Sequence, residues 1–380
     1  MSPVPGPPNP PETRSRAVES IGPDADQGFA PGLEGAPSPA SVPAEIDLAD
    51  SRLYVNRELS LLEFNSRVLE QAKDPRVPLL ERLRFLTICS TNLDEFFEIR
   101  AAGQRQQIHY DIVRPGPDGL GPQETLNQIH AKASRLVAEQ YRVLNEELLP
   151  ALGEKGIHVI SRQAWDEEQT RWAEDFFRNE VVPVITPMGL DPAHPFPRVV
   201  NKSLNFFVSL EGKDAFGRDS RMAVVPVPRS LSRLIPMPRE VARGKYAFAM
   251  LSSIVHAHIE QIFPGMRVTG CFQFRVTRDS DLWVDEEEVE DLMLALKVEL
   301  QSRQFGDAVR LEVADNCDDE LVEFLLDNFK LGPRDLYRVN GPVNLHRLSA
   351  IYAAVDRPDL KYPPFLPGTP RRVANASNVF

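Results

Sequence analysis

The stretch from Leu83 to Phe97 constrains the fold most, because it combines a buried helical pattern with a polar interruption. Its apolar residues recur at helical spacing, but a Ser-Thr-Asn run stands in the middle. Asn92, followed three residues later by Glu95, has the form of a helix N-cap with a back-bonding acid. We therefore predict a helix that ends near Cys89, a short break, and a second helix that begins at Leu93.

A break of this kind predicts a small ligand site. The free backbone N–H groups at a helix start attract oxygen acceptors and anions. The Asn92 side chain would add an amide, which offers both a donor and an acceptor. The alternative is that Asn92 is a structural cap and nothing more. The residues alone favour that alternative, because asparagine caps are common.

Residues 51–156 carry the helical periodicity of an antiparallel bundle. Ser60-Leu-Leu-Glu63 has the form of a capping box, and Pro78 suits an early helical position. The Pro- and Gly-rich segment 114–122 is typical of a loop. A long helix is expected from Gln123 to Leu152, before two glycines. We predict an all-α N-terminal domain of about four helices.

Residues 157–357 change to short apolar runs bounded by Pro or Gly, which are typical of strands. Helical patterns at 251–263, after Asp285 and after Asp318 interleave with them. We predict an α+β head domain with a mixed, mostly antiparallel sheet and helices on one face, so the fold class is multidomain, α and α+β. The expected strands are Val181–Thr186, Ser203–Leu210, Arg221–Val227, Tyr246–Met250, Val268–Trp283 and Ala308–Val313.

The two ends differ in composition from the rest. Residues 1–50 hold eleven of the 34 prolines and one aromatic residue, and they account for half of the formal net charge of −12. Such a segment buries too little apolar surface to fold, so we predict a disordered acidic leader, with a proline-rich ligand for a partner domain as the alternative. Residues 358–380 read as a Pro-rich linker.

The remaining composition excludes several classes of function. The body of the chain is only mildly acidic, so no nucleic-acid partner is expected. Three widely spaced cysteines suit a reducing cytoplasm and indicate no zinc site. There is no apolar run of about 18 residues and no secretory signal, so we expect a cytoplasmic protein without a transmembrane segment.

The usual catalytic motifs are absent from the sequence. It has no GxxxxGK[ST] phosphate loop and no nucleophile signature. His256 and His258 would face different sides of a helix, so a shared metal is not expected. The acids at 286–291 are better explained by the preference for acids in the first turn of a helix. We therefore name no catalytic and no metal-binding residue in this chain.

Several motifs resemble the polyphosphate kinase family, in its large bacterial form that phosphorylates itself on histidine. The resemblance covers about residues 50–372 in order and leaves out the leader. It is carried by Tyr54-Val-Asn-Arg-Glu-Leu-Ser-Leu-Leu-Glu-Phe-Asn-Ser-Arg-Val-Leu69, Ser90-Thr-Asn-Leu-Asp-Glu-Phe-Phe97, His194-Pro-Phe-Pro197, Asn201-Lys-Ser-Leu-Asn205 and Tyr362-Pro-Pro-Phe-Leu-Pro-Gly-Thr-Pro370.

The resemblance implies a helical N-terminal domain, a head domain that makes dimer contacts, and then two catalytic domains. Family members transfer the terminal phosphate of ATP reversibly to inorganic polyphosphate through a phosphohistidine, with Mg²⁺. The match ends in the linker, so the phosphorylated histidine and the magnesium ligands are expected outside these 380 residues. One family ligand carries over: Asn92, which contacts ATP.

Two functions therefore remain open. In the first, the chain supplies the N-terminal part of the ATP site and the dimerisation head of a homo-oligomeric kinase, and is inactive alone. In the second, it is a non-catalytic interaction or regulatory module derived from the family. A cytoplasmic location is expected in both, with membrane association as part of a complex left open.

Overall fold

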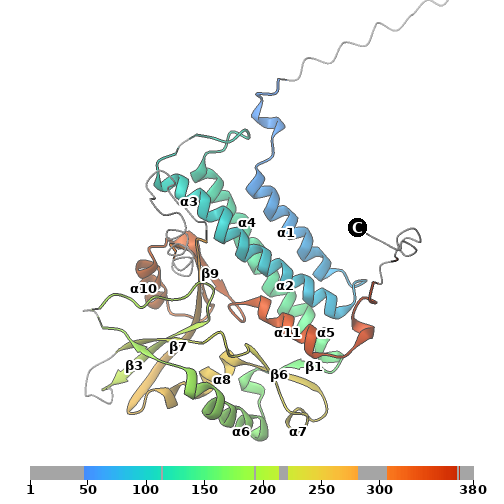
Figure 1. Ribbon diagram of the computed structural model, residues 1–380, viewed down its shortest axis with the longest axis vertical. Helices are drawn as coiled ribbons and strands as arrows, with labels where there is room; N and C mark the ends of the chain where they lie inside the picture. Colours follow the sequence, from blue (N-terminus) through green and yellow to red (C-terminus); the bar gives the residue numbers. More distant parts are fainter. Residues whose placement is uncertain are drawn as a thin grey trace, which may run out of the picture. The chain divides into compact units, whose positions relative to one another are not determined.

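The computed structural model of the chain describes residues 47–112, 114–191, 194–213, 221–280, 306–365 and 368 (Figure 1). The chain divides into two units, Met1–Leu48 and Ala49–Phe380, and every helix and strand named below belongs to the second. Nearly all of the predicted leader lies outside the described residues, and so does the helix expected after Asp285.

The first part of the second unit is helical, as predicted. Helices α1, α2 and α4 lie side by side, and short segments connect them (Figure 1). Their facing sides bury leucines such as Leu69, Leu83 and Leu136, which form one core. The helices are α1 (Arg57–Lys73), α2 (Leu79–Glu95), α3 (Ala102–His109), α4 (Pro122–Arg142) and α5 (Leu149–Glu154), with π-helical turns η2 (Phe96–Ala101) and η3 (Val143–Leu148) between α2 and α3 and between α4 and α5.

The predicted break in the Leu83–Phe97 stretch is wrong, because α2 continues through Asn92 to Glu95. The polar side chains are satisfied without a break. Thr91 Oγ1 donates to the carbonyl of Thr87 at 3.0 Å, one turn back, and Asn92 pairs with Asn65 of α1. The irregularity comes four residues later, where η2 begins.

The predicted start of α1 is also wrong. The N-cap is Asn56, whose Oδ1 accepts from the backbone N–H groups of Glu58 and Leu59, both at 3.0 Å. Its Nδ2 donates to Asp118 at 2.7 Å, so the 114–122 loop fixes the cap. Ser60 lies inside the helix instead of capping it. The long helix predicted at Gln123–Leu152 is confirmed as the continuous path from α4 through η3 to α5.

The second part contains a six-stranded sheet of order β2-β4-β3-β7-β8-β9 and a three-stranded sheet of order β1-β6-β5. Neighbouring strands are antiparallel except for β8 with β9 and β1 with β6, which confirms a mixed, mostly antiparallel arrangement. The strands are β1 (Ile157–Val159), β2 (Met188–Gly189), β3 (Asn205–Gly212), β4 (Met222–Pro226), β5 (Leu234–Pro236), β6 (Tyr246–Met250), β7 (Met266–Arg278), β8 (Ala308–Ala314) and β9 (Leu336–Val339).

Helices cover both faces of the large sheet, where only one covered face was expected. Phe206 and Val208 of β3 pack into the core that includes α8, and Phe207 between them packs into a second core with α10. This alternation follows from the two-residue period of a strand. The helices of this part are α6 (Glu167–Phe176), α7 (Arg239–Ala242), α8 (Leu251–His258), α10 (Asp319–Phe329) and α11 (Ser349–Ala354).

The strand predicted at Val181–Thr186 is wrong. The chain there forms the helical turns η5 (Phe177–Val181) and η6 (Val182–Val184). Pro183 cannot donate to a sheet ladder, and its fixed φ suits a helical turn. Further along, a strand was expected at Val268–Trp283, of which residues 281–283 lie outside the described residues. Its described part is a single strand, β7, which ends at Arg278.

The beginning of the predicted linker packs against α2. The backbone N–H of Tyr362 donates to Glu81 Oε1 at 3.1 Å, and the Tyr352 hydroxyl of α11 donates to the same oxygen at 2.7 Å. None of the described helices is both long and apolar enough to cross a membrane.

Candidate functional site

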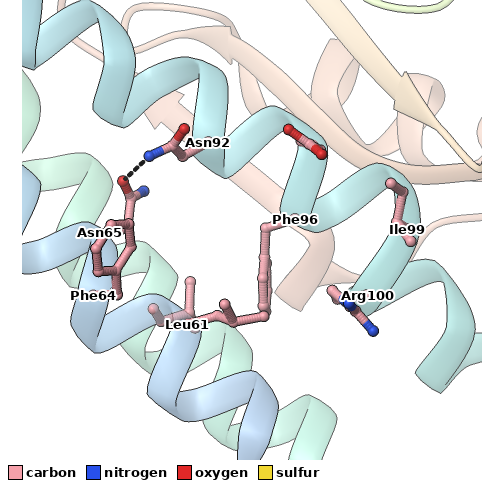
Figure 2. A pocket seen from close by; sticks show the side chains of 9 residues that line it. Leu61, Phe64, Asn65, Asn92, Phe96, Ile99 and Arg100 are labelled. Carbon is pink, nitrogen blue, oxygen red and sulfur yellow. Dashed lines mark hydrogen bonds between the residues drawn. The ribbon is translucent and has the colours of Figure 1, made fainter. Parts of the chain in front are cut away.

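A pocket of about 280 Å³ lies between α1 and the junction of α2 with η2 (Figure 2). Asn92, singled out from the sequence, is part of its wall. The other eight lining residues were not predicted as site residues, because the contact between α1 and α2 brings them together. The lining residues are Leu61, Leu62, Phe64, Asn65, Asn92, Glu95, Phe96, Ile99 and Arg100.

Two asparagines form the polar end of this pocket. Asn92 Nδ2 donates to Asn65 Oδ1 at 3.2 Å, as the dashed line in Figure 2 shows. Asn65 is buried, and its own Nδ2 donates to the carbonyl of Cys89 at 2.9 Å. The chain of bonds fixes which way each amide points. Within the described part of the chain, Asn92 Oδ1 has no hydrogen-bond partner, so it remains available to a donor in the pocket.

Apolar side chains form the walls. Phe96 and Leu61 extend toward each other from η2 and α1 (Figure 2). Phe64 is 51% exposed and Ile99 is 37% exposed, which is high for large apolar residues that share one pocket. A flat apolar group placed between them would cover this surface, and the hydrophobic effect would favour its binding.

Two charged residues complete the lining, Glu95 at the end of α2 and Arg100 in η2. Arg100 Nε lies 4.0 Å from Glu58 Oε2, which is buried and has no hydrogen-bond partner within the described residues. A cation held near one end of the pocket can pair with an anionic group on a ligand. The pocket therefore suits a ligand that has a flat apolar part, a polar edge and a negative charge.

Two consecutive phenylalanines of the π-helical turn η2 have different surroundings. Phe96 lines the pocket, whereas the Phe97 ring is fully buried and lies 4.6 Å from the guanidinium carbon of Arg310 on β8. Turns of this type insert an extra residue into a helix and are frequent at functional sites. This turn therefore supplies one side chain to the pocket wall and one that packs against the large sheet.

On the sheet side, α2 is fixed by a buried ionic cluster of Asp94, Arg275, Arg310 and Glu312. Burial alone would raise the pKa of the Asp94 carboxyl, but the two guanidinium groups outweigh it and hold that pKa below its usual range. Burial raises the pKa of Glu312. Sequence reasoning missed this cluster, because its members come from α2, β7 and β8.

Other residues considered from the sequence do not gather at this pocket. The His256 ring contacts Arg162, whereas the His258 ring lies 5.4 Å from that of Phe177, so the two histidines face different partners. Within the described residues no three histidine, cysteine or acidic side chains form a group that could hold a metal ion. The acids at 286–291 lie outside the described residues.

Comparison with known proteins identifies the two parts of the chain. Residues 54–160 match the family described as polyphosphate kinase N-terminal domain, and residues 168–351 match the polyphosphate kinase middle domain. A polyphosphate kinase from Pseudomonas aeruginosa is 53% identical over 331 residues, which is 87% of this chain and 48% of that protein. One from Neisseria meningitidis serogroup B is 52% identical over 324 residues, 85% of this chain and 47% of that protein.

A solved structure shares the fold. The crystal structure of polyphosphate kinase from Porphyromonas gingivalis superimposes with a TM-score of 0.67 at 24% sequence identity, over 86% of this chain and 45% of that one. The chain spans about half the length of the curated relatives it matches. Because the two domain matches follow one another in order and together span most of the chain, it belongs to the polyphosphate kinase family, of which it carries the N-terminal and middle domains.

Proposed function

We propose that the pocket between α1 and α2 binds the base of ATP, as the N-terminal part of the ATP site of a polyphosphate kinase. The observation that carries the proposal is the position of Asn92. Its amide oxygen has no partner in the described structure, and it lies at the polar end of an apolar pocket. This is also the residue on which the family motif places a contact to ATP.

The shape and chemistry of the pocket support a purine. A purine is flat and apolar on its faces, so it can pack between Phe96 and the exposed Phe64. Its edge carries ring nitrogens and, in adenine, an amino group. That amino group could donate to Asn92 Oδ1, which accepts no bond from the described residues. Arg100, from the same lining, offers a cation to the phosphates.

In the complete enzyme we propose the reversible transfer of the terminal phosphate of ATP to inorganic polyphosphate through a phosphohistidine. The pocket contributes binding and orientation to that reaction, because its lining offers amides, apolar walls, one carboxylate and one guanidinium. The carboxylate of Glu95 would not hold Mg²⁺ without further oxygen ligands from the phosphates. Mg²⁺ is therefore proposed to enter with the nucleotide phosphates. We propose no turnover by the 380 residues alone.

The family also suggests an assembly and a compartment. We propose that residues 157–357 form the head through which the protein makes a homo-oligomer in the cytoplasm. Val182 and Val184 of η6 support this proposal, because each is more than 40% exposed on the surface of that part. Sedimentation of the chain over a range of concentrations tests it, and a monomer at all concentrations would contradict it.

Binding of ATP to the purified chain tests the pocket. We expect titration calorimetry to show that Asn92→Ala weakens ATP binding by about tenfold, the effect of one lost hydrogen bond of about 1.4 kcal/mol. The control is Asn328→Ala, which removes an exposed helical asparagine of α10 that bonds only its own helix. Equal affinities in the two variants would contradict the proposal. GTP should bind more weakly than ATP, because it has no amino group at the same ring position.

An activity assay separates the two functions left open by the sequence. The chain is incubated with ATP and Mg²⁺, and polyphosphate is measured. No synthesis is expected, and robust synthesis would contradict the assignment of transfer to residues outside this chain. If the chain also fails to bind ATP, the regulatory-module alternative is favoured over the proposal.

A further inference from the structure

A second, smaller cavity is lined by buried polar atoms that have no partner within the described residues. They are Arg233 Nη1, Arg347 Nε and Asn344 Oδ1. Arg233 precedes β5, and the other two residues belong to the segment before α11. Lys202 and Ser252 also line the cavity. Unpartnered buried polar atoms are rare in folded proteins, so two such donors and one such acceptor around one cavity indicate a ligand.

The charges at this cavity are not balanced by acids. Arg233 is only 8% exposed, and neither Arg233 nor Arg347 forms an ion pair in the described part of the chain. Among the described residues, Lys202 is the cation of this cavity that forms an ion pair with a carboxylate. Its Nζ lies 2.7 Å from Glu98 Oε2. Among the described residues, the Arg233 side chain makes one hydrogen bond, from Nη2 to the carbonyl of Val227 at 2.8 Å.

Leaving these guanidiniums together without an anion costs free energy. Burial, together with the charges of Arg347 and Arg229, lowers the pKa of Arg233 to about 10. Burial and the nearby Arg229 lower the pKa of Arg347 as well. Two desolvated cations that repel each other are stabilised when an anion binds between them.

A helix start adds to this positive field. Ser252 lies in the first turn of α8, and α8 has no side-chain cap. The free N–H groups and the dipole of such a helix end favour an anion. Asn344 can present its amino group to the same anion, because a half-turn of the amide exchanges oxygen and nitrogen.

We propose that Arg233, Arg347 and the start of α8 form a phosphate-binding site that is distinct from the pocket of Asn92. The cavity, of about 20 Å³, accepts one small group and is too small for a nucleotide. A phosphate group fits the charge and the fork geometry of guanidiniums. Its source is either free orthophosphate or, if the proposed function holds, the end of a polyphosphate chain.

The site lies across α2 from the nucleotide pocket. Thr91, next to Asn92, faces the segment that carries Arg347, and its Oγ1 lies 2.9 Å from His346 Nδ1. Asn92 itself points to α1, where it bonds Asn65. The two sites therefore share no lining residue.

Titration calorimetry of the chain in phosphate-free buffer of low ionic strength tests the proposal. The probes are orthophosphate and tripolyphosphate. The binding of each probe is measured for the wild type, for Arg347→Gln and for Arg233→Met. We expect each variant to weaken binding about tenfold or more, as for the loss of one charged hydrogen-bonding partner. Tripolyphosphate that binds much more tightly than orthophosphate identifies the chain end as the ligand, and equal affinities identify free phosphate.

Two controls keep the test decisive. Arg267→Gln removes an exposed arginine of β7 that pairs with Glu211, and it should leave binding unchanged. Asn92→Ala should also leave phosphate binding unchanged, so failure of the nucleotide pocket and failure of this site give different results. Because Arg233→Met could impair folding, circular dichroism checks that each variant is folded. Arg347→Gln replaces a less buried residue and is therefore the second, safer variant. Absence of phosphate binding by the wild type, or equal binding by Arg347→Gln and Arg267→Gln, would overturn the proposal.

Discussion

Asp94 on α2 and Arg275 on β7 are 181 residues apart in the sequence and are joined by two hydrogen bonds, of 2.7 and 3.0 Å, inside the protein. The pair attaches α2, which lines the proposed nucleotide pocket, to the large sheet. Asn92 is two residues before Asp94, so the two side chains leave α2 on different sides. The position of the pocket wall thus depends on a contact with the second domain of the chain.

Asp94→Asn is expected to destabilise the chain by about 3–5 kcal/mol, the usual cost of removing one partner from a buried ionic cluster. Asparagine keeps the shape of the side chain but leaves Arg275 and Arg310 with less compensating charge. Urea denaturation measures the free energy of unfolding. The control is Glu211→Gln, which breaks the exposed pair with Arg267 and should change that free energy by less than about 1 kcal/mol. Similar losses in the two variants would contradict the assigned role of Asp94.

The sequence predicted a helical part followed by an α+β part, and strands are present at five of the six expected segments, because the apolar periods of these segments are local. The start of α1 could not be read in the same way, since Asn56 is favoured over Ser60 by a contact with Asp118, which is 62 residues away. The continuity of α2 through Asn92 depends on Asn65 of another helix. Tertiary contacts of this kind override local capping patterns.

The residues of the candidate site could be predicted from the sequence only in part, for the same reason. Asn92 was found because it stands out as a polar residue in an apolar helix, and the family motif includes it. Phe64 and Arg100 carry no such signal, because they join Asn92 only when α1 packs on α2. The Asp94 and Arg275 pair connects different domains and has no signature in either segment.

The free energy of unfolding is expected to fall as the pH drops below about 6.5, in part because of His130. Burial lowers the pKa of His130, and this effect exceeds the opposing charge of Asp335. Asp335 is already paired with Arg105, at 2.8 Å. The unfolded state therefore binds a proton that the folded state does not, and the contribution of His130 is complete only above its unfolded pKa.

Urea denaturation at several values between pH 7.5 and pH 5.5 (about one unit on either side of the unfolded pKa) measures this slope. His130→Gln should give a shallower slope than the wild type. The control, Asn328→Ala on α10, changes no titratable group and should leave the slope as it is. An unchanged slope in His130→Gln would show that other groups cause the pH dependence.

The three cysteines should resist thiol reagents while the chain is folded. All three are free and buried, and burial raises the pKa of Cys89 and Cys271 to about 12 and that of Cys317 to about 11. Little thiolate is then present at pH 8 (about the unperturbed thiol pKa). A chromogenic disulfide reagent should release colour slowly from the native chain and three equivalents in urea. Rapid release of one equivalent from the native chain would identify a thiol that is more accessible than the structure indicates.

Two glycine substitutions should have opposite effects on stability. Gly341 has a φ of +153°, and a Cβ there would lie 3.1 Å from the ring of Tyr141, whose hydroxyl donates to the carbonyl of Pro342 at 2.6 Å. Gly341→Ala should destabilise by about 1–3 kcal/mol through backbone strain and the displaced ring. Gly103 lies inside α3 with no atom near the position of an added Cβ, so Gly103→Ala should stabilise by about 0.5–1 kcal/mol. Both changes add the same methyl group, and urea denaturation compares them directly. If Gly341→Ala is as stable as Gly103→Ala, the contact with Tyr141 does not restrain this turn.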